Sequence, residues 1–77
     1  MNPYQLLANA IVLQAARDYR DVLRRWKKNK SDANTNFERK ELESFFSSGW
    51  FGILSDLDGE VLMQKIQEQV LGKAVAV

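Results

Sequence analysis

The stretch PYQLLANAIVLQAARDYRDVLRRWKK, residues 3–28, decides the fold of this 77-residue chain. After Pro3 neither glycine nor proline interrupts it, and Leu, Ala, Gln, Arg and Lys all favour helix. Asn2 is a good N-cap, and Pro3 suits the first helical position, where a missing N–H costs nothing. The stretch therefore predicts one long helix over residues 3–28.

Apolar side chains recur along this helix at spacings of three and four residues, which places them on one face. They are Tyr4, Ala8, Ile11, Ala15, Tyr19, Val22 and Trp26. We expect this stripe to pack against the rest of the chain and to form one side of an aromatic core.

Two shorter helices are expected after the long one, separated from it by a polar loop over residues 29–35. Thr35 and Glu38 have the spacing of a capping box, which predicts a second helix over residues 36–47. Ser48 and Gly49 break that helix, and residues 48–56 are expected to form a turn that contains one short helical turn over residues 50–54.

The last helix is expected over residues 57–71. Asp56 or Asp58 would cap its start, because an aspartate oxygen accepts hydrogen bonds from free helix N–H groups. Gly72 is its predicted stop, followed by a tail over residues 72–77 that either frays or docks. The fold class is therefore all-α: a small helical bundle of one long and two shorter helices with a short intervening helical turn, in a single domain over residues 1–77.

The composition narrows the chemistry that the chain could perform. It holds 11 Lys and Arg against 10 Asp and Glu, a net charge of +1, with no Cys and no His. Disulfides, thiolate metal sites and the usual general base are thereby excluded, although a Ser–Lys pair stays open. We expect no enzyme, no metal site and no cofactor.

The segment DLDGE, residues 56–60, resembles part of a calcium-binding loop. Aligning Gly59 with the required sixth position places Leu54 at position one and Lys65 at position twelve, where acidic ligands are needed. The segment is therefore interpreted as a helix start.

The face of the long helix opposite the apolar stripe changes character halfway along. Its first half carries Leu6, Ala10 and Leu13, all apolar. A helix that is apolar on both sides is normally buried on both. Either the last helix and the Ala-Val tail cover this side, or a second copy does, most simply in a two-fold dimer.

The second half of the opposite face is basic, with Arg17, Arg20, Arg24, Lys27 and Lys28. Residues 17–30 hold seven basic and two acidic groups, a net +5, whereas residues 31–77 hold four basic and eight acidic groups, a net −4. Solvated cations that complement the C-terminal end of the helix are one explanation. A contact with phosphates or with an acidic protein surface is the other, although a pI near 8.0 is low for a general nucleic-acid binder.

Trp50 and Phe51 stand together between two breaks in the helical pattern. Two large aromatic side chains on a tight turn plug the end of a helical core. If either is exposed, it becomes a candidate interface anchor, because tryptophan is common among binding hot spots.

The string FFSSGWF, residues 45–51, followed by Leu54 and the DLDGE segment, resembles small uncharacterised helical proteins of Gram-positive phages and integrated mobile elements. The opening NPYQLLANA, residues 2–10, is similar to the starts of those proteins as well. The resemblance implies a compact accessory protein in the cytoplasm of a bacterial host, acting on host or phage machinery. It carries no functional residue with it.

These observations predict a non-enzymatic binding protein whose partner is a protein of the host or the phage, for instance in counter-defence. The alternative is a binder of nucleic acid or nucleotide phosphates through the basic face, and a structural homo-oligomer is a second alternative. Residues 6–13 fall far short of the roughly 20 apolar residues that span a bilayer, so no membrane partner is expected.

Overall fold

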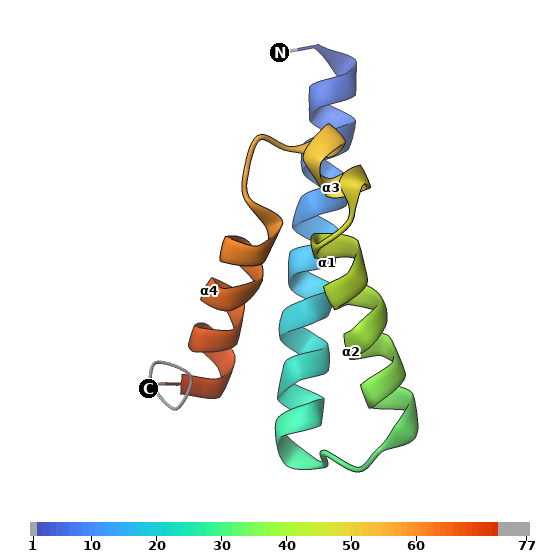
Figure 1. Ribbon diagram of the computed structural model, residues 1–77, viewed down its shortest axis with the longest axis vertical. Coiled ribbons are helices and arrows are strands. Elements are labelled where there is room, and N and C mark those ends of the chain that lie inside the picture. The colour runs from blue at the N-terminus through green and yellow to red at the C-terminus, as the bar shows by residue number, and fades with distance from the viewer. Residues whose placement is uncertain (1, 73–77) are drawn as a thin grey trace.

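The computed structural model describes residues 2–72, which form four helices and no strand. They are α1 (Pro3–Lys28), α2 (Ala33–Phe46), the short α3 (Gly49–Leu54) and α4 (Gly59–Leu71) (Figure 1). The all-α prediction is confirmed, and so are both ends of the long helix, whose N-cap Asn2 accepts a hydrogen bond from the Gln5 amide at 2.8 Å.

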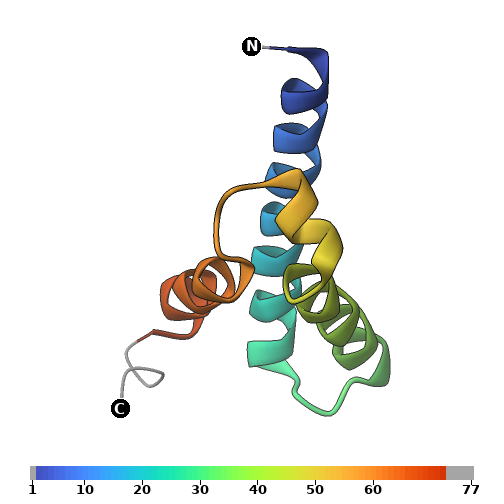
Figure 2. The same cartoon turned by 45° about the horizontal axis from the view of Figure 1, so that its top comes forward.

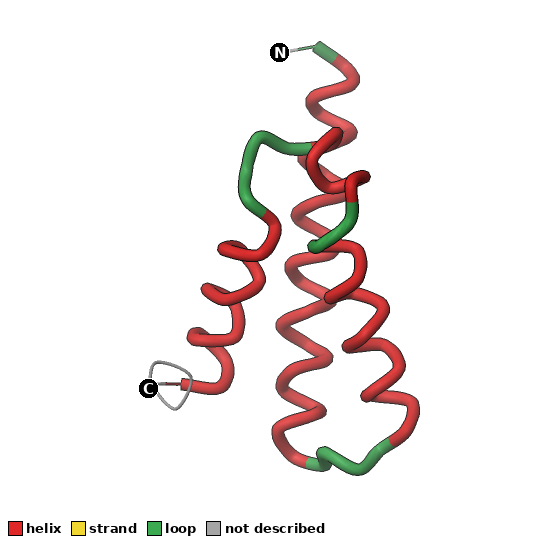
Figure 3. The backbone as a smooth tube through the Cα atoms, in the orientation of Figure 1, coloured by secondary structure: helices red, strands yellow, loops and turns green. Residues whose placement is uncertain are grey.

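The helices are arranged around the second half of α1. α2 returns antiparallel along one side of it, α3 lies near its middle, and α4 runs back along the other side (Figures 1 and 2). α1 packs against both α2 and α4, which also contact each other. Short loops join the helices (Figure 3), and the first turns of α1 extend beyond the rest of the bundle.

The buried face of α1 differs from the predicted stripe. Its buried residues are Val12, Ala15, Ala16, Tyr19, Val22 and Leu23. The prediction is therefore right for Ala15, Tyr19 and Val22, but wrong for Tyr4, which is 84% exposed, and for the exposed Ile11. Two neighbouring helices bury a wider arc of α1 than one stripe supplies, and no residue of α1 before Val12 is buried.

Tyr19 lies at the centre of the bundle and is completely buried. Its hydroxyl donates to Oε2 of Glu43 on α2 and accepts from Nε2 of Gln67 on α4, both at 2.9 Å. Burial raises the pKa of this phenol well above its usual value of 10.0. The ring packs against Phe46 at 5.5 Å between centroids, so one side chain connects three helices.

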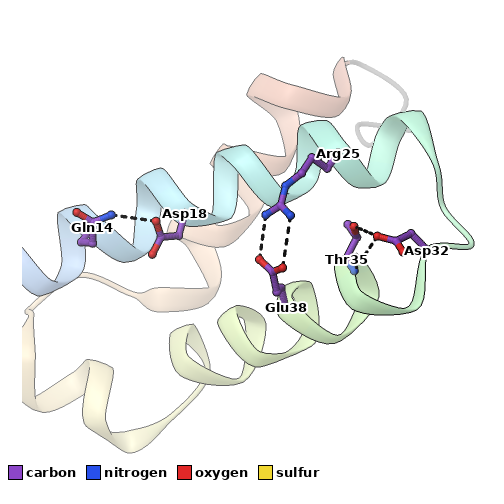
Figure 4. A network of polar contacts seen from close by, with 6 residues as sticks. All are labelled: Gln14, Asp18, Arg25, Asp32, Thr35 and Glu38. Carbon is purple, nitrogen blue, oxygen red and sulfur yellow. Dashed lines mark hydrogen bonds and ion pairs between the residues drawn. The ribbon is translucent and has the colours of Figure 1, made fainter.

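The start of α2 differs from the predicted capping box of Thr35 and Glu38. Asp32 is the N-cap, and its carboxylate accepts from both the amide and the hydroxyl of Thr35, which is buried (Figure 4). These two hydrogen bonds, and chiefly the one from the hydroxyl, hold the pKa of Asp32 below its usual range. Glu38 binds Arg25 of α1 at 2.9 Å instead of capping. α2 therefore spans Ala33–Phe46 and not residues 36–47.

The later helix ends follow the predicted residues more closely. Ser48 caps α3. Of the two candidates for α4, Asp58 is the cap and accepts from the amides of Glu60 and Val61, so α4 begins at Gly59 and not at residue 57. Gly72 ends α4 with φ of 82°, as predicted. The predicted tail, apart from Gly72, lies outside the described residues.

Candidate functional site

The first half of α1 exposes most of its large apolar side chains. Half of the exposed large apolar residues in the described chain lie on it, namely Tyr4, Leu6, Leu7, Ile11 and Leu13. No residue from 2 to 16 carries a charged side chain. Exposed apolar patches of this kind are typical of interaction surfaces.

One part of this surface is the predicted oligomer face, on the side of α1 away from the core. Leu6 is 58% exposed, Leu13 is 50% exposed, and Ala10 between them is exposed as well. The expectation that the last helix covers this side is wrong, because α4 packs on another side of α1, against its second half. The tail residues 73–77, the other part of that expectation, lie outside the described residues. We call Leu6, Ala10 and Leu13 the outer patch.

A second apolar surface lies toward α2, and two of its members, Tyr4 and Ile11, were expected to face the core. Tyr4, Leu7 and Ile11 follow one another along one side of α1, at spacings of three and four residues. Ile11 then borders an open hollow of about 320 Å³ between α1 and α2. Leu42 and Phe45 of α2 form its opposite wall, and its lining is almost entirely apolar.

The same groove becomes acidic further along. A second hollow of about 290 Å³ shares Asp18 and Leu42 with the first. It is lined by Asp18, Asp21, Arg25, Phe37, Glu38, Glu41 and Leu42. We call the two hollows together the α1/α2 groove.

Figure 4 shows how the charges of this groove are held. Arg25 donates to both oxygens of Glu38, and this contact holds the pKa of Glu38 below its usual range and raises that of Arg25. Gln14 donates to Asp18 at 2.9 Å. One guanidinium thus faces four carboxylates, so this part of the groove is negative. Phe37 at its edge is 66% exposed.

The predicted basic face forms a groove on the other side of α1. Four of its five members, Arg20, Arg24, Lys27 and Lys28, line a hollow of about 660 Å³ with Gln69 and Val70 of α4. Arg17 is exposed but does not line it. No carboxylate belongs to the lining. We call this the α1/α4 groove.

Part of the positive charge in the α1/α4 groove is already engaged. Lys27 Nζ donates to the Val70 carbonyl at 3.3 Å, and Arg20 Nε donates to Gln69 at 3.1 Å. Asp21 forms an ion pair with Arg24, whose Nη1 lies 3.1 Å from the Asp21 Oδ1. α1 and α4 both end at this end of the molecule, and cations there stabilise the negative ends of two helix dipoles (Figure 1).

The structure separates the two candidate aromatic anchors. Phe51 is 1% exposed and packs against Phe45 and Phe46 at 5.8 and 5.6 Å between ring centroids. It is a core residue, and its assignment as an anchor is wrong. Trp50 is 67% exposed and stays a candidate anchor on α3.

Length arithmetic could have revealed the exposed half of α1. A helix of 26 residues is about 39 Å long, whereas helices of 13 or 14 residues are about 20 Å long. Because α2 starts near the C-terminal end of α1 and α4 ends there, these two short helices leave roughly half of α1 uncovered (Figure 1). The apolar stripe alone carried no such signal, because its periodicity continues to Tyr4.

Within residues 2–72, no three His, Cys, Asp or Glu side chains are grouped so that they could hold a metal ion. None of the described helices combines the length and the apolar character needed to cross a membrane.

Comparisons with protein-family models, with curated proteins and with solved structures find no match to this chain. The resemblance to phage and mobile-element proteins therefore stays a prediction.

Proposed function

We propose that this chain is a non-enzymatic binding protein that occupies a surface of a partner protein through the α1/α2 groove. The observation that carries the proposal is the continuous apolar path from Tyr4 and Leu7 to Ile11 and into the hollow bordered by Leu42. In line with the sequence resemblance, we place it among accessory proteins of phages and mobile elements that act on host or phage machinery in a bacterium.

The groove suggests the chemistry of the partner. A helix laid between two packed helices is held by apolar side chains at three- and four-residue spacing. Such a helix would set these side chains on Ile11 and Leu42 and reach the carboxylates of Asp18 and Glu41 further along. Lys or Arg on that part of the partner would meet opposite charge, so the groove fits a basic amphipathic helix.

The test is affinity capture from a Gram-positive bacterial lysate treated with nuclease. The bait proteins are the wild type, Leu7→Glu and a matched control, Gln64→Glu, which adds the same charge at an exposed position of α4. A partner held by the wild type and the control but lost with Leu7→Glu supports the proposal. Capture that Leu7→Glu leaves unchanged, or that nuclease removes, contradicts it.

A second candidate function is binding of phosphate groups, and the α1/α4 groove favours it because four cations line it without a carboxylate. It ranks second because Lys27 and Arg24 already have partners. Binding of a single-stranded oligonucleotide or of ATP should fall steeply between 50 and 200 mM salt, since counterions are released.

The matching variant is the double change Arg20→Glu and Arg24→Glu. Exposed surface changes usually cost less than about 0.5 kcal/mol each, so this variant should fold. It should lose phosphate binding because two attractive contacts become repulsive. A folded double variant with unchanged affinity for the oligonucleotide and for ATP would reduce the α1/α4 groove to a solvated surface.

A further inference from the structure

The outer patch on α1 is self-complementary about its centre. Leu6 precedes Ala10 by four residues and Leu13 follows it by three, so a large side chain stands one helical turn away on either side of a small one. All three side chains are exposed in the single chain. A two-fold contact between identical chains requires this kind of symmetry, in which residue i meets residue j and j meets i.

We propose that the outer patch binds a second copy of this chain, with the two α1 helices antiparallel and the two-fold axis passing beside Ala10. In this arrangement Leu6 packs on the partner's Leu13, and Leu13 packs on the partner's Leu6. The two Ala10 residues face each other, and their small side chains allow the helix axes to approach to about 8 Å, the short end of helix packing distances.

The charges on the same face of α1 select the antiparallel orientation. Beyond the outer patch that face is basic, with Arg17, Arg20 and Arg24. In a parallel pair each of these residues would lie beside its own copy, and like charges at close range repel. In an antiparallel pair centred on Ala10, Arg17 lies opposite the partner's Pro3, and the later basic residues pass beyond the end of the partner's α1.

The rest of the bundle leaves room for this pair. The buried residues of α1, such as Val12, Ala16 and Tyr19, lie on the side of the helix away from the outer patch. α2 and α4, which cover the buried face of α1, therefore lie on the side of the helix away from the outer patch. The centre of the outer patch also lies about 130° around α1 from the line of Tyr4, Leu7 and Ile11, given 3.6 residues per turn. Pairing therefore leaves both α1/α2 grooves open and does not rest on the proposed function.

Cysteine cross-linking tests the orientation directly, because the natural chain has no Cys. Ala10→Cys should form a disulfide-linked dimer, since residue 10 faces its own copy across the axis. Thiols held together have an effective concentration of about millimolar, so at ~10 μM protein cross-linking should be at least tenfold faster than in a Tyr4→Cys control. Equal rates for the two variants would overturn the proposal.

Two further variants distinguish antiparallel from parallel pairing. Leu6→Cys and Leu13→Cys should each cross-link slowly alone but rapidly when mixed, because residue 6 meets residue 13. Rapid cross-linking of each variant with itself would indicate a parallel pair and contradict the proposed orientation.

Analytical ultracentrifugation tests the assembly without cross-links. The wild type should be a dimer at about 100 μM, and Leu13→Glu should raise the dimer dissociation constant at least about a hundredfold, because two carboxylates per dimer lose water without a partner. Tyr4→Glu, at an exposed position about 120° around α1 from Ala10, should stay dimeric. A monomeric wild type overturns this inference but leaves the proposed function standing. A Tyr4→Glu protein that stays dimeric and still captures a partner refutes only the proposed function.

Discussion

Replacing Gly59 by alanine tests the packing of the bundle at its tightest point. Gly59 is the first residue of α4 and is buried against the C-terminal end of α2. A Cβ atom built there would lie 1.9 Å from the carbonyl oxygen of Phe46, 2.9 Å from its carbonyl carbon and 3.1 Å from Cδ1 of Phe51. The added methyl group therefore meets backbone, which cannot rotate away as a side chain can.

The expected cost of Gly59→Ala follows from this geometry. Since Cβ atoms essentially never approach another heavy atom within 3.0 Å, α2 and α4 must separate by about 1 Å at this point. Overpacking a core costs about 1–3 kcal/mol, and a clash with backbone lies at or beyond the upper end, so we expect about 3 kcal/mol or more. A chain of this length has a free energy of unfolding of about 4–12 kcal/mol, so the variant should lose a large part of it.

The assay is urea unfolding followed by circular dichroism, at one fixed protein concentration so that any change in dimer content does not enter. Gly52→Ala is the matched control, because nothing lies within 4 Å of a Cβ at that position on α3 and alanine favours helix over glycine by up to about 1 kcal/mol. The melting temperature of Gly59→Ala should be lower than that of the wild type by roughly 12 °C or more, at about 4–8 °C per kcal/mol. A Gly59→Ala protein within about 0.5 kcal/mol of the wild type would refute the reasoning.

Two other changes probe polar contacts in the structure. Tyr19→Phe should lower the free energy of unfolding by about 1–3 kcal/mol, because it removes hydrogen bonds to Glu43 and Gln67 from a buried site. Tyr4→Phe, at the exposed end of α1, is the control and should have no effect in the same urea titration. Asp32→Ala should lower the free energy of unfolding at pH 7, because the N-cap of α2 is lost. Because the folded-state pKa of Asp32 is lowered, that difference should be fully present above the usual pKa of 3.8 and shrink as pH falls through the lower value; a difference that persists at pH 2 in thermal melts would contradict the capping role.

Helix ends were predictable from sequence where local signals had no competitor. Asn2 and Pro3 start α1, and Gly72 ends α4 with a positive φ, as local capping rules predict. At the start of α2 two caps were available, and local rules could not choose between them. The structure uses Asp32, because Thr35 is buried and Glu38 is held by an arginine of another helix. That choice depends on tertiary contacts.

The surfaces were predictable only in part. The basic residues and the outer patch followed from the periodicity of one helix, because a face of α1 is defined by α1 alone. The α1/α2 groove could not be found this way, since Leu42 and Phe45 come beside Ile11 only when α2 folds back antiparallel. The separation of Trp50 from Phe51 likewise depends on which side of α3 meets the core.

The two halves of α1 carry different tasks, and this bears on how the proposed contacts work together. The second half supplies most of the buried side chains of α1, whereas the residues from Pro3 to Ile11 bury none. The exposed leucines of the first half therefore contribute little to the stability of the single chain, as the proposed contacts with other chains require. If a second copy covers the outer patch, the dimer presents two α1/α2 grooves fixed on opposite sides of the axis. A partner with two matching helices would then bind more tightly than a partner with one, because its second helix binds at a high effective concentration. Leu13→Glu, which breaks the dimer, should weaken the binding of such a partner without changing the groove.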